Sequence, residues 1–137
     1  MKTVYKEVLI ANGQRRSIMF PIQTDSELDD YMLIYRPRRW ITPHVGRILC
    51  FRDLSSAKMF AERNFFKGTY EIWEAKAKGV SRVSKVLDPW FWRHNPSAVE
   101  VFWANFELHK YIKTLSHMKA PEGTVGAKAI KLERKVA

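Results

Sequence analysis

The sequence has one cysteine, Cys50, and no long apolar segment in its 137 residues. A single cysteine excludes a disulfide within the chain, and its apolar neighbours Leu49 and Phe51 predict a buried small side chain. No apolar run approaches the roughly 18 residues that a membrane-spanning helix needs. The start of the chain also lacks the apolar core of a signal peptide. These absences predict a protein of the reducing cytoplasm with no membrane partner.

Features of catalytic and metal chemistry are also scarce. The six glycines are isolated from one another, which excludes a glycine-rich phosphate loop. The four histidines and the cysteine do not have the spacing of a zinc site. Glu71 and Glu74 are expected on opposite faces of a strand, which is a poor arrangement for an acid/base pair. We therefore expect no cofactor, no catalytic residues and a protein that is not an enzyme.

The chain carries charge of mainly one sign. Twenty-four Lys and Arg residues against fourteen Asp and Glu residues give a net charge of +10. A field of this sign favours nucleic acids and other phosphate-bearing partners. The alternative is that the charge serves solubility alone. The charge therefore narrows the class of partner without naming an activity.

Local patterns predict a single globular domain over residues 1–137. Asn12 and Gly13 between two alternating segments, residues 3–11 and 15–20, predict a β-hairpin. Further strands are predicted at residues 31–35, 47–52 and 69–77. Asp53 or Ser55 is expected to cap a helix that continues to about residue 64, because apolar side chains recur there at helical spacing.

The second half of the chain is predicted to add a helix and a strand. Ser97 and Glu100 have the spacing of a capping box, which predicts a helix over residues 98–115. Residues 125–136 are expected to form a strand with one solvated face, or a basic tail. The predicted fold class is α+β, with a mixed or mainly antiparallel sheet of about five to six strands and two helices packed on it.

Three segments together resemble small uncharacterised proteins that bacteriophages and bacterial genomes carry. The segments are Trp40 with residues 46–51 and 57–61, residues 70–79, and residues 121–125 with 129–132. The resemblance extends loosely from about Trp40 to Val136 and depends on packing patterns, so it supplies no catalytic residues. It implies a phage or prophage accessory protein, located in the host cytoplasm if phage-encoded.

An arginine-rich segment is the best candidate for a ligand-binding site. Three guanidiniums and an indole on a proline-bent segment can clamp phosphates and stack a base. Two further arginines flank the strand at residues 47–52 and could extend the basic surface. The predicted ligand-binding residues are Arg36, Arg38, Arg39, Trp40, Arg47 and Arg52. The alternative is a solvated basic loop with Trp40 folded into the core.

A second candidate is the aromatic segment at residues 90–94. If exposed, Trp90, Trp92 and Arg93 would form a partner-binding site, because Trp and Arg dominate binding hot spots. If buried, the same rings would close a hydrophobic corner of the domain.

These observations favour a non-enzymatic, phage-type accessory protein that binds nucleic acid or another phosphate-rich ligand. One alternative is a protein inhibitor of a host defence factor, which would use the tryptophan segment as its contact surface. An enzyme acting on a nucleotide-like substrate is a third hypothesis, although no base or nucleophile is identifiable. A homodimer remains compatible with the sequence.

Overall fold

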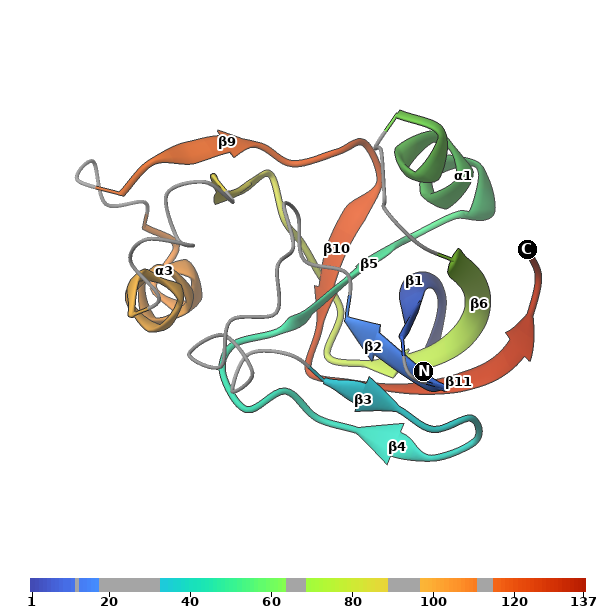
Figure 1. The fold of residues 1–137 in the computed structure, drawn as a ribbon. Coiled ribbons are helices and arrows are strands. Elements are labelled where there is room, and N and C mark those ends of the chain that lie inside the picture. Colours follow the sequence, from blue (N-terminus) through green and yellow to red (C-terminus); the bar gives the residue numbers. More distant parts are fainter. Residues whose placement is uncertain (12, 18–32, 64–68, 89–96, 111–114) are drawn as a thin grey trace.

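The computed structural model describes the chain apart from residue 12 and residues 18–32, 64–68, 89–96 and 111–114 (Figure 1). The described part contains a nine-stranded antiparallel sheet, a two-stranded sheet and two helices. The strands are β1 (Lys2–Ala11), β2 (Gln14–Ser17), β3 (Ile34–Tyr35), β4 (Trp40–Ile41), β5 (Ile48–Phe51), β6 (Thr69–Lys78), β7 (Ser81–Arg82), β8 (Lys85–Leu87), β9 (His117–Lys119), β10 (Thr124–Ala127) and β11 (Ala129–Lys135). The helices are α1 (Leu54–Arg63) and α3 (Ala98–Glu107).

The structure contains two helices and a large antiparallel sheet, as the predicted α+β class requires, but the predicted size of the sheet is wrong. Nine strands pair in the main sheet, where five to six were expected. Three of them, β3, β4 and β7, have only two residues each. Strands this short cannot show the alternation by which a strand is recognised in a sequence.

The predicted hairpin is confirmed in β1 and β2. Ala11 pairs with Gln14, so the connection has two residues. Gly13 has a φ of 73°, a left-handed conformation that glycine adopts without a steric penalty. Its neighbour Asn12 lies outside the described residues. β1 also pairs along its length with β6, from Lys2 opposite Ala77 to Ile10 opposite Thr69.

The main sheet closes on itself because two pairs of consecutive strands, β6 with β7 and β10 with β11, each continue around a bend. β6 continues through Gly79 into β7, and β10 continues through Lys128 into β11. β6 pairs with β11 and β7 pairs with β10, so the two strands form one bent antiparallel ribbon. The bend requires a φ of 63° at Gly79, where a Cβ atom would also meet the side chain of Lys128. β10 then pairs with β5, β5 with β1, and β1 with β6, which completes a small barrel.

The barrel interior holds the largest hydrophobic core. Every second residue of each strand points inward, so Ala75 and Ala77 of β6 face Ile130 and Leu132 of β11 inside. The predicted burial of Cys50 is confirmed, with 2% of the residue exposed. The charged side chain of Lys6 lies inside as well.

Helix α1 covers part of the outer face of the barrel. Its cap is confirmed as Asp53, whose carboxylate accepts hydrogen bonds from the Ser56 amide (2.7 Å) and the Ser55 hydroxyl (2.8 Å). The helix packs its apolar side on Phe51 of β5 and Ile72 of β6.

Helix α3 begins without the predicted capping box, and this prediction is wrong. Ser97 has helical backbone angles and makes no side-chain cap. The helix also ends at Glu107, well before residue 115. It ends in a Schellman motif, in which left-handed His109 (φ 57°) donates to Phe106 O and Lys110 donates to Asn105 O. Glycine is the usual residue at this position, so histidine did not signal the helix end.

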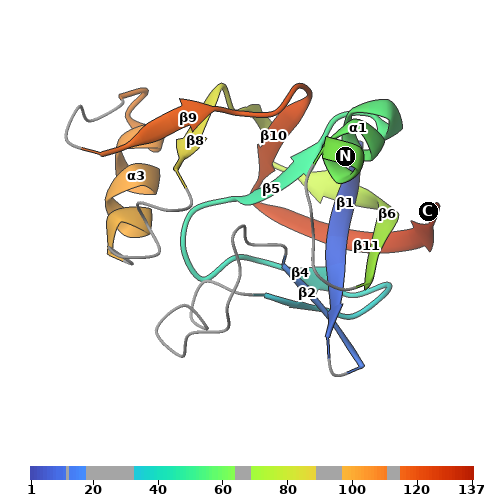
Figure 2. The same cartoon turned by 45° about the horizontal axis from the view of Figure 1, so that its top comes forward.

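Helix α3 packs beside the two-stranded sheet of β8 and β9, at the opposite end of the molecule from α1 (Figure 2). The apolar cluster of α3 includes Leu49 of β5, so α3 touches the main sheet at this residue but does not cover a face of it as α1 does. Across the described ranges, no helix has the length and apolar character needed to cross a membrane.

Candidate nucleic-acid interface

The turn between β3 and β4 presents the first three predicted arginines. Arg36, Arg38 and Arg39 are exposed, and in the described part of the chain none of their guanidiniums forms an ion pair. Pro37 fixes its own φ, and Arg38 follows with a left-handed φ of 63°. The amide of Arg38 donates a 2.7 Å hydrogen bond to Leu132 O, which attaches the turn to β11.

The left-handed conformation of Arg38 is strained. A side chain with a Cβ atom in this region costs about 1 to 2 kcal/mol, whereas glycine adopts it freely. The fold therefore holds an arginine at a position where glycine would be more stable. Strain of this kind is typical of sites whose residues serve binding.

Trp40 follows the turn and is partly exposed, at 37%. The alternative of a fully buried Trp40 is therefore wrong. Trp40 lies opposite Lys131 of β11, and Lys131 lies opposite Lys76 of β6, so the three side chains share the outer face. The ammonium groups of Lys78 and Lys131 lie 4.1 Å and 5.3 Å from the centre of an indole ring of Trp40. Cations at these positions are held by the ring electrons.

The arginine turn and this row form one basic surface, which we name the tryptophan face. It contains six cationic side chains, of which Lys78 and Lys131 lie over the indole, with Glu133 3.4 Å from Lys131 as an acidic neighbour. Its members are Arg36, Arg38, Arg39, Trp40, Lys76, Lys78 and Lys131.

Three lysines of this face were missed from the sequence. Lys76 and Lys78 alternate with the alanines of β6, and Lys131 alternates with the apolar residues of β11. This period of two places them on one face of the sheet. The pairing of β4 with β11, which brings Trp40 to them, has no signal in the sequence.

Arg47 does not join the tryptophan face. Its guanidinium donates to both carboxylate oxygens of Glu107 (2.8 and 3.2 Å) and to Gly79 O (2.6 Å). It also lies 5.5 Å from the centre of the Phe106 ring, and its side chain is only 7% exposed. The hydrogen bonds from Arg47 lower the pKa of Glu107. This arginine fastens α3 to the bend of the barrel.

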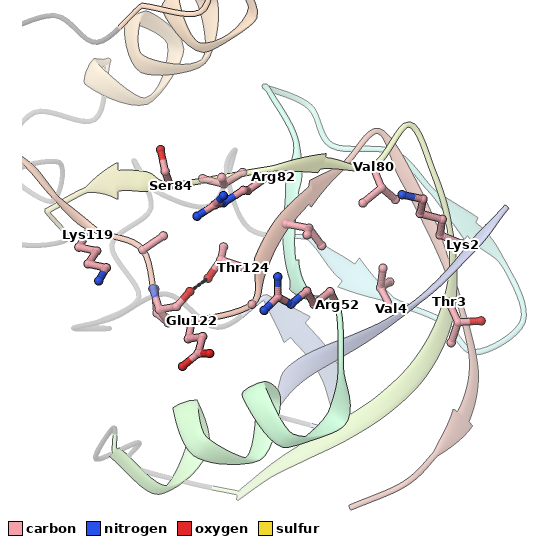
Figure 3. Close-up of a pocket in the computed structure, with 15 residues that line it drawn as sticks. Lys2, Thr3, Val4, Arg52, Val80, Arg82, Ser84, Lys119, Glu122 and Thr124 are labelled. Atoms are coloured by element: carbon pink, nitrogen blue, oxygen red, sulfur yellow. Dashed lines mark hydrogen bonds between the residues drawn. The ribbon is translucent and has the colours of Figure 1, made fainter.

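Arg52 belongs to a different part of the surface. Its side chain is 62% exposed and lies 3.3 Å from Asp53. It lines a cavity of about 680 Å³ together with residues of β1, β7 and the segment before β10 (Figure 3). The structure thus divides the six predicted arginine and tryptophan residues among three places.

Trp90, Trp92 and Arg93 lie outside the described residues, so the partner-binding hypothesis stays a prediction. Within the described residues there is no group of three His, Cys, Asp or Glu side chains that could hold a metal ion.

Comparisons with known proteins add no relative. No family model, curated protein or solved structure matches the chain. The resemblance to phage and prophage proteins therefore stays a prediction.

Proposed function

We propose that the protein binds single-stranded nucleic acid at the tryptophan face and is not an enzyme. Guanidinium and ammonium groups contact phosphates without reading the sequence. An aromatic ring among them offers a stacking surface to one base of an unpaired strand. The net charge of +10 would also draw a polyanion toward the protein.

The observation that carries the proposal is the setting of Trp40. Its indole is partly exposed, two lysine ammoniums lie within 5.3 Å of a ring centre, and three exposed arginines precede it in the chain. A base stacked on this ring would place its neighbouring phosphates within reach of these cations. A duplex hides the faces of its bases, so the arrangement favours unpaired strands.

The test is fluorescence anisotropy with labelled single-stranded RNA, single-stranded DNA and duplex DNA at two salt concentrations. We expect a single strand to bind more tightly than the duplex, with an affinity that falls steeply as salt rises. Replacing Arg38 and Arg39 with alanine should weaken binding about tenfold and make the salt dependence shallower, because two phosphate contacts are lost.

The matched control removes the same amount of charge elsewhere. Lys58 and Arg63 are exposed on α1, and replacing both with alanine should change the affinity less than about twofold. Equal losses in the two double variants would reduce the interaction to overall charge and overturn the proposed site. Absence of binding by the unaltered protein at low salt would overturn the function.

A further inference from the structure

The cavity beside Arg52 lies where β1 and β5 separate from each other. These two strands pair at one position, Tyr5 opposite Phe51. The start of β1 stays paired with β6 instead, which opens a gap toward β7 and β10. Apolar residues that are almost fully buried, Val4, Val83 and Val125, form its inner wall. At about 680 Å³ it has the size of an ordinary small-ligand site.

Four exposed cations from four different segments surround this cavity. They are Lys2 of β1, Arg52 after β5, Arg82 of β7 and Lys119 of β9 (Figure 3). Glu122 is the one acidic side chain among the fifteen lining residues. Within the described chain Lys2, Arg82 and Lys119 have no carboxylate partner. Figure 3 shows Arg82 and Arg52 in the middle of this row, with Lys2 at one end of the cavity and Lys119 at the other. Cations along one cavity favour an anion that carries several charges.

The wall that carries Lys119 and Glu122 is held by hydrogen bonds. The Thr124 hydroxyl donates to Pro121 O (2.5 Å), and the Ala120 amide donates to Ser84 O (3.0 Å). The Arg52 amide donates to Gly123 O (2.9 Å), which joins this wall to the opposite rim. A wall that is ordered before the ligand arrives loses little entropy on binding.

We propose that this cavity binds a di- or triphosphate group. A group with several negative charges in a row can contact Arg52 and Arg82 together with a lysine at one end of the cavity, whereas a single phosphate would leave most of these cations without a phosphate contact. The site goes beyond the proposed function, because its residues differ from those of the tryptophan face. Thr3 lines the cavity, but its hydroxyl points away from it and accepts a hydrogen bond from Lys76 of the tryptophan face (3.2 Å; Figure 3).

The experiment is titration of the 137-residue chain with inorganic triphosphate in a calorimeter at low and moderate salt. We expect saturable binding to one site, and replacing Arg52 and Arg82 with alanine should weaken it at least tenfold. The Lys58→Ala, Arg63→Ala control should weaken it less than about twofold. No binding of triphosphate, or equal losses in these two variants, would overturn the proposal.

A variant with the opposite sign separates recognition from misfolding. Replacing Glu122 with Gln removes the acidic side chain from the rim and should tighten triphosphate binding about threefold. A damaged fold would weaken binding, so tighter binding in this variant excludes misfolding as its cause. Unchanged or weaker binding by a folded Glu122→Gln protein would contradict the proposed geometry.

Two sources of the phosphate group are distinguished by further ligands. A free nucleotide is indicated if ATP competes with triphosphate and a single strand binds equally with or without a 5′-triphosphate. The end of a strand is indicated if a 5′-triphosphate strengthens strand binding and the Arg52→Ala, Arg82→Ala variant loses this gain. Both outcomes support the cavity.

The same measurements keep this site apart from the proposed function. Triphosphate binding without strand binding would sustain the cavity and remove the tryptophan face. Strand binding without triphosphate binding would sustain the tryptophan face and remove the cavity as a phosphate site. The Arg38→Ala, Arg39→Ala variant should bind triphosphate as the unaltered protein does.

Discussion

Charged side chains have opposite surroundings in the interior of the molecule and on the tryptophan face. Inside, Lys6 donates a 2.7 Å hydrogen bond to Leu49 O, and Arg47 is held by Glu107 and Gly79 O. Outside, Arg38 and Arg39 are exposed without a carboxylate partner in the described part of the chain. All four residues are basic, and they differ in whether the fold supplies them with hydrogen-bond partners.

The comparison teaches that a basic residue shows its role through its partners. The Arg47 guanidinium uses most of its donors within the fold, so it stabilises the native state and has few donors left for a ligand. Lys6 is closed off from a ligand by burial, which also lowers the pKa of its ammonium. A cation without such partners contributes little to stability and keeps its donors available. Charge alone had grouped Arg47 with Arg38, and the structure separates them.

The largest effect is expected at the buried carboxyl of Glu7. It lies opposite Ile72 in β6 and is 3% exposed. Burial raises its pKa from 4.5 to about 7, against the opposing effects of Lys6 and the Ala61 amide. The folded state therefore holds this proton more tightly than the unfolded state. Its contribution to stability is complete below pH 4.5 and is lost as the pH rises to about 7.

Replacing Glu7 with Gln should abolish this decline. Urea unfolding from pH 4 to 8 should show a loss on the order of 3 kcal/mol in the unaltered protein and none from this group in the variant. The pKa values of Asp53 and Glu71 are lowered, so their contributions change at the acidic end of this range, below about pH 4.5, and not between pH 4.5 and 7. If the free energies of unfolding of the two proteins changed with pH in parallel, ionisation of Glu7 would not destabilise the folded state, and the prediction would be wrong.

Replacing Arg47 with Ala tests the interior side of the comparison. The variant loses two hydrogen bonds to Glu107, one to Gly79 O and the packing on Phe106, so it should be less stable by about 2 kcal/mol. Urea unfolding at pH 7 measures this loss. Strand affinity should change less than about twofold in the folded variant. A variant that is as stable as the unaltered protein but binds strands more weakly would show that Arg47 contacts the nucleic acid.

The smallest effect on stability is expected on the tryptophan face. Replacing Arg38 with Gly removes one cation and relieves its left-handed strain, so stability should stay the same or rise by up to about 1 kcal/mol. Strand affinity should nevertheless fall about threefold, because one phosphate contact is lost. Thermal unfolding and anisotropy measure the two quantities. A fall in stability with unchanged affinity would assign Arg38 to the fold alone.

Local signals predicted the elements that local interactions specify. Asn12 and Gly13 predicted the first hairpin, Asp53 predicted the start of α1, and alternation predicted β5 and most of β6. These features depend on neighbouring residues, so a short window of sequence contains them.

Features that depend on distant partners could not be predicted. The two residues of β4 become a strand only because β11, some ninety positions later, pairs with them. Trp40 and Lys131 meet through this pairing, and so the tryptophan face was seen only in part. The contact of Arg47 could not be predicted for the same reason. Its partner Glu107 lies on α3, and the sequence predicted this helix but not the surface on which it packs.

The central position of β1 has a consequence for how the chain folds during synthesis. β1 leaves the ribosome before its partners β5 and β6, which follow about forty to seventy residues later, and closure waits for β10 and β11. Before β5 and β6 emerge, β2 is the one described strand that can pair with β1. Folding should therefore be slow and nearly all-or-none, because long loops close before contacts repay them. A nascent chain halted before residue 124 would present an open sheet edge to chaperones.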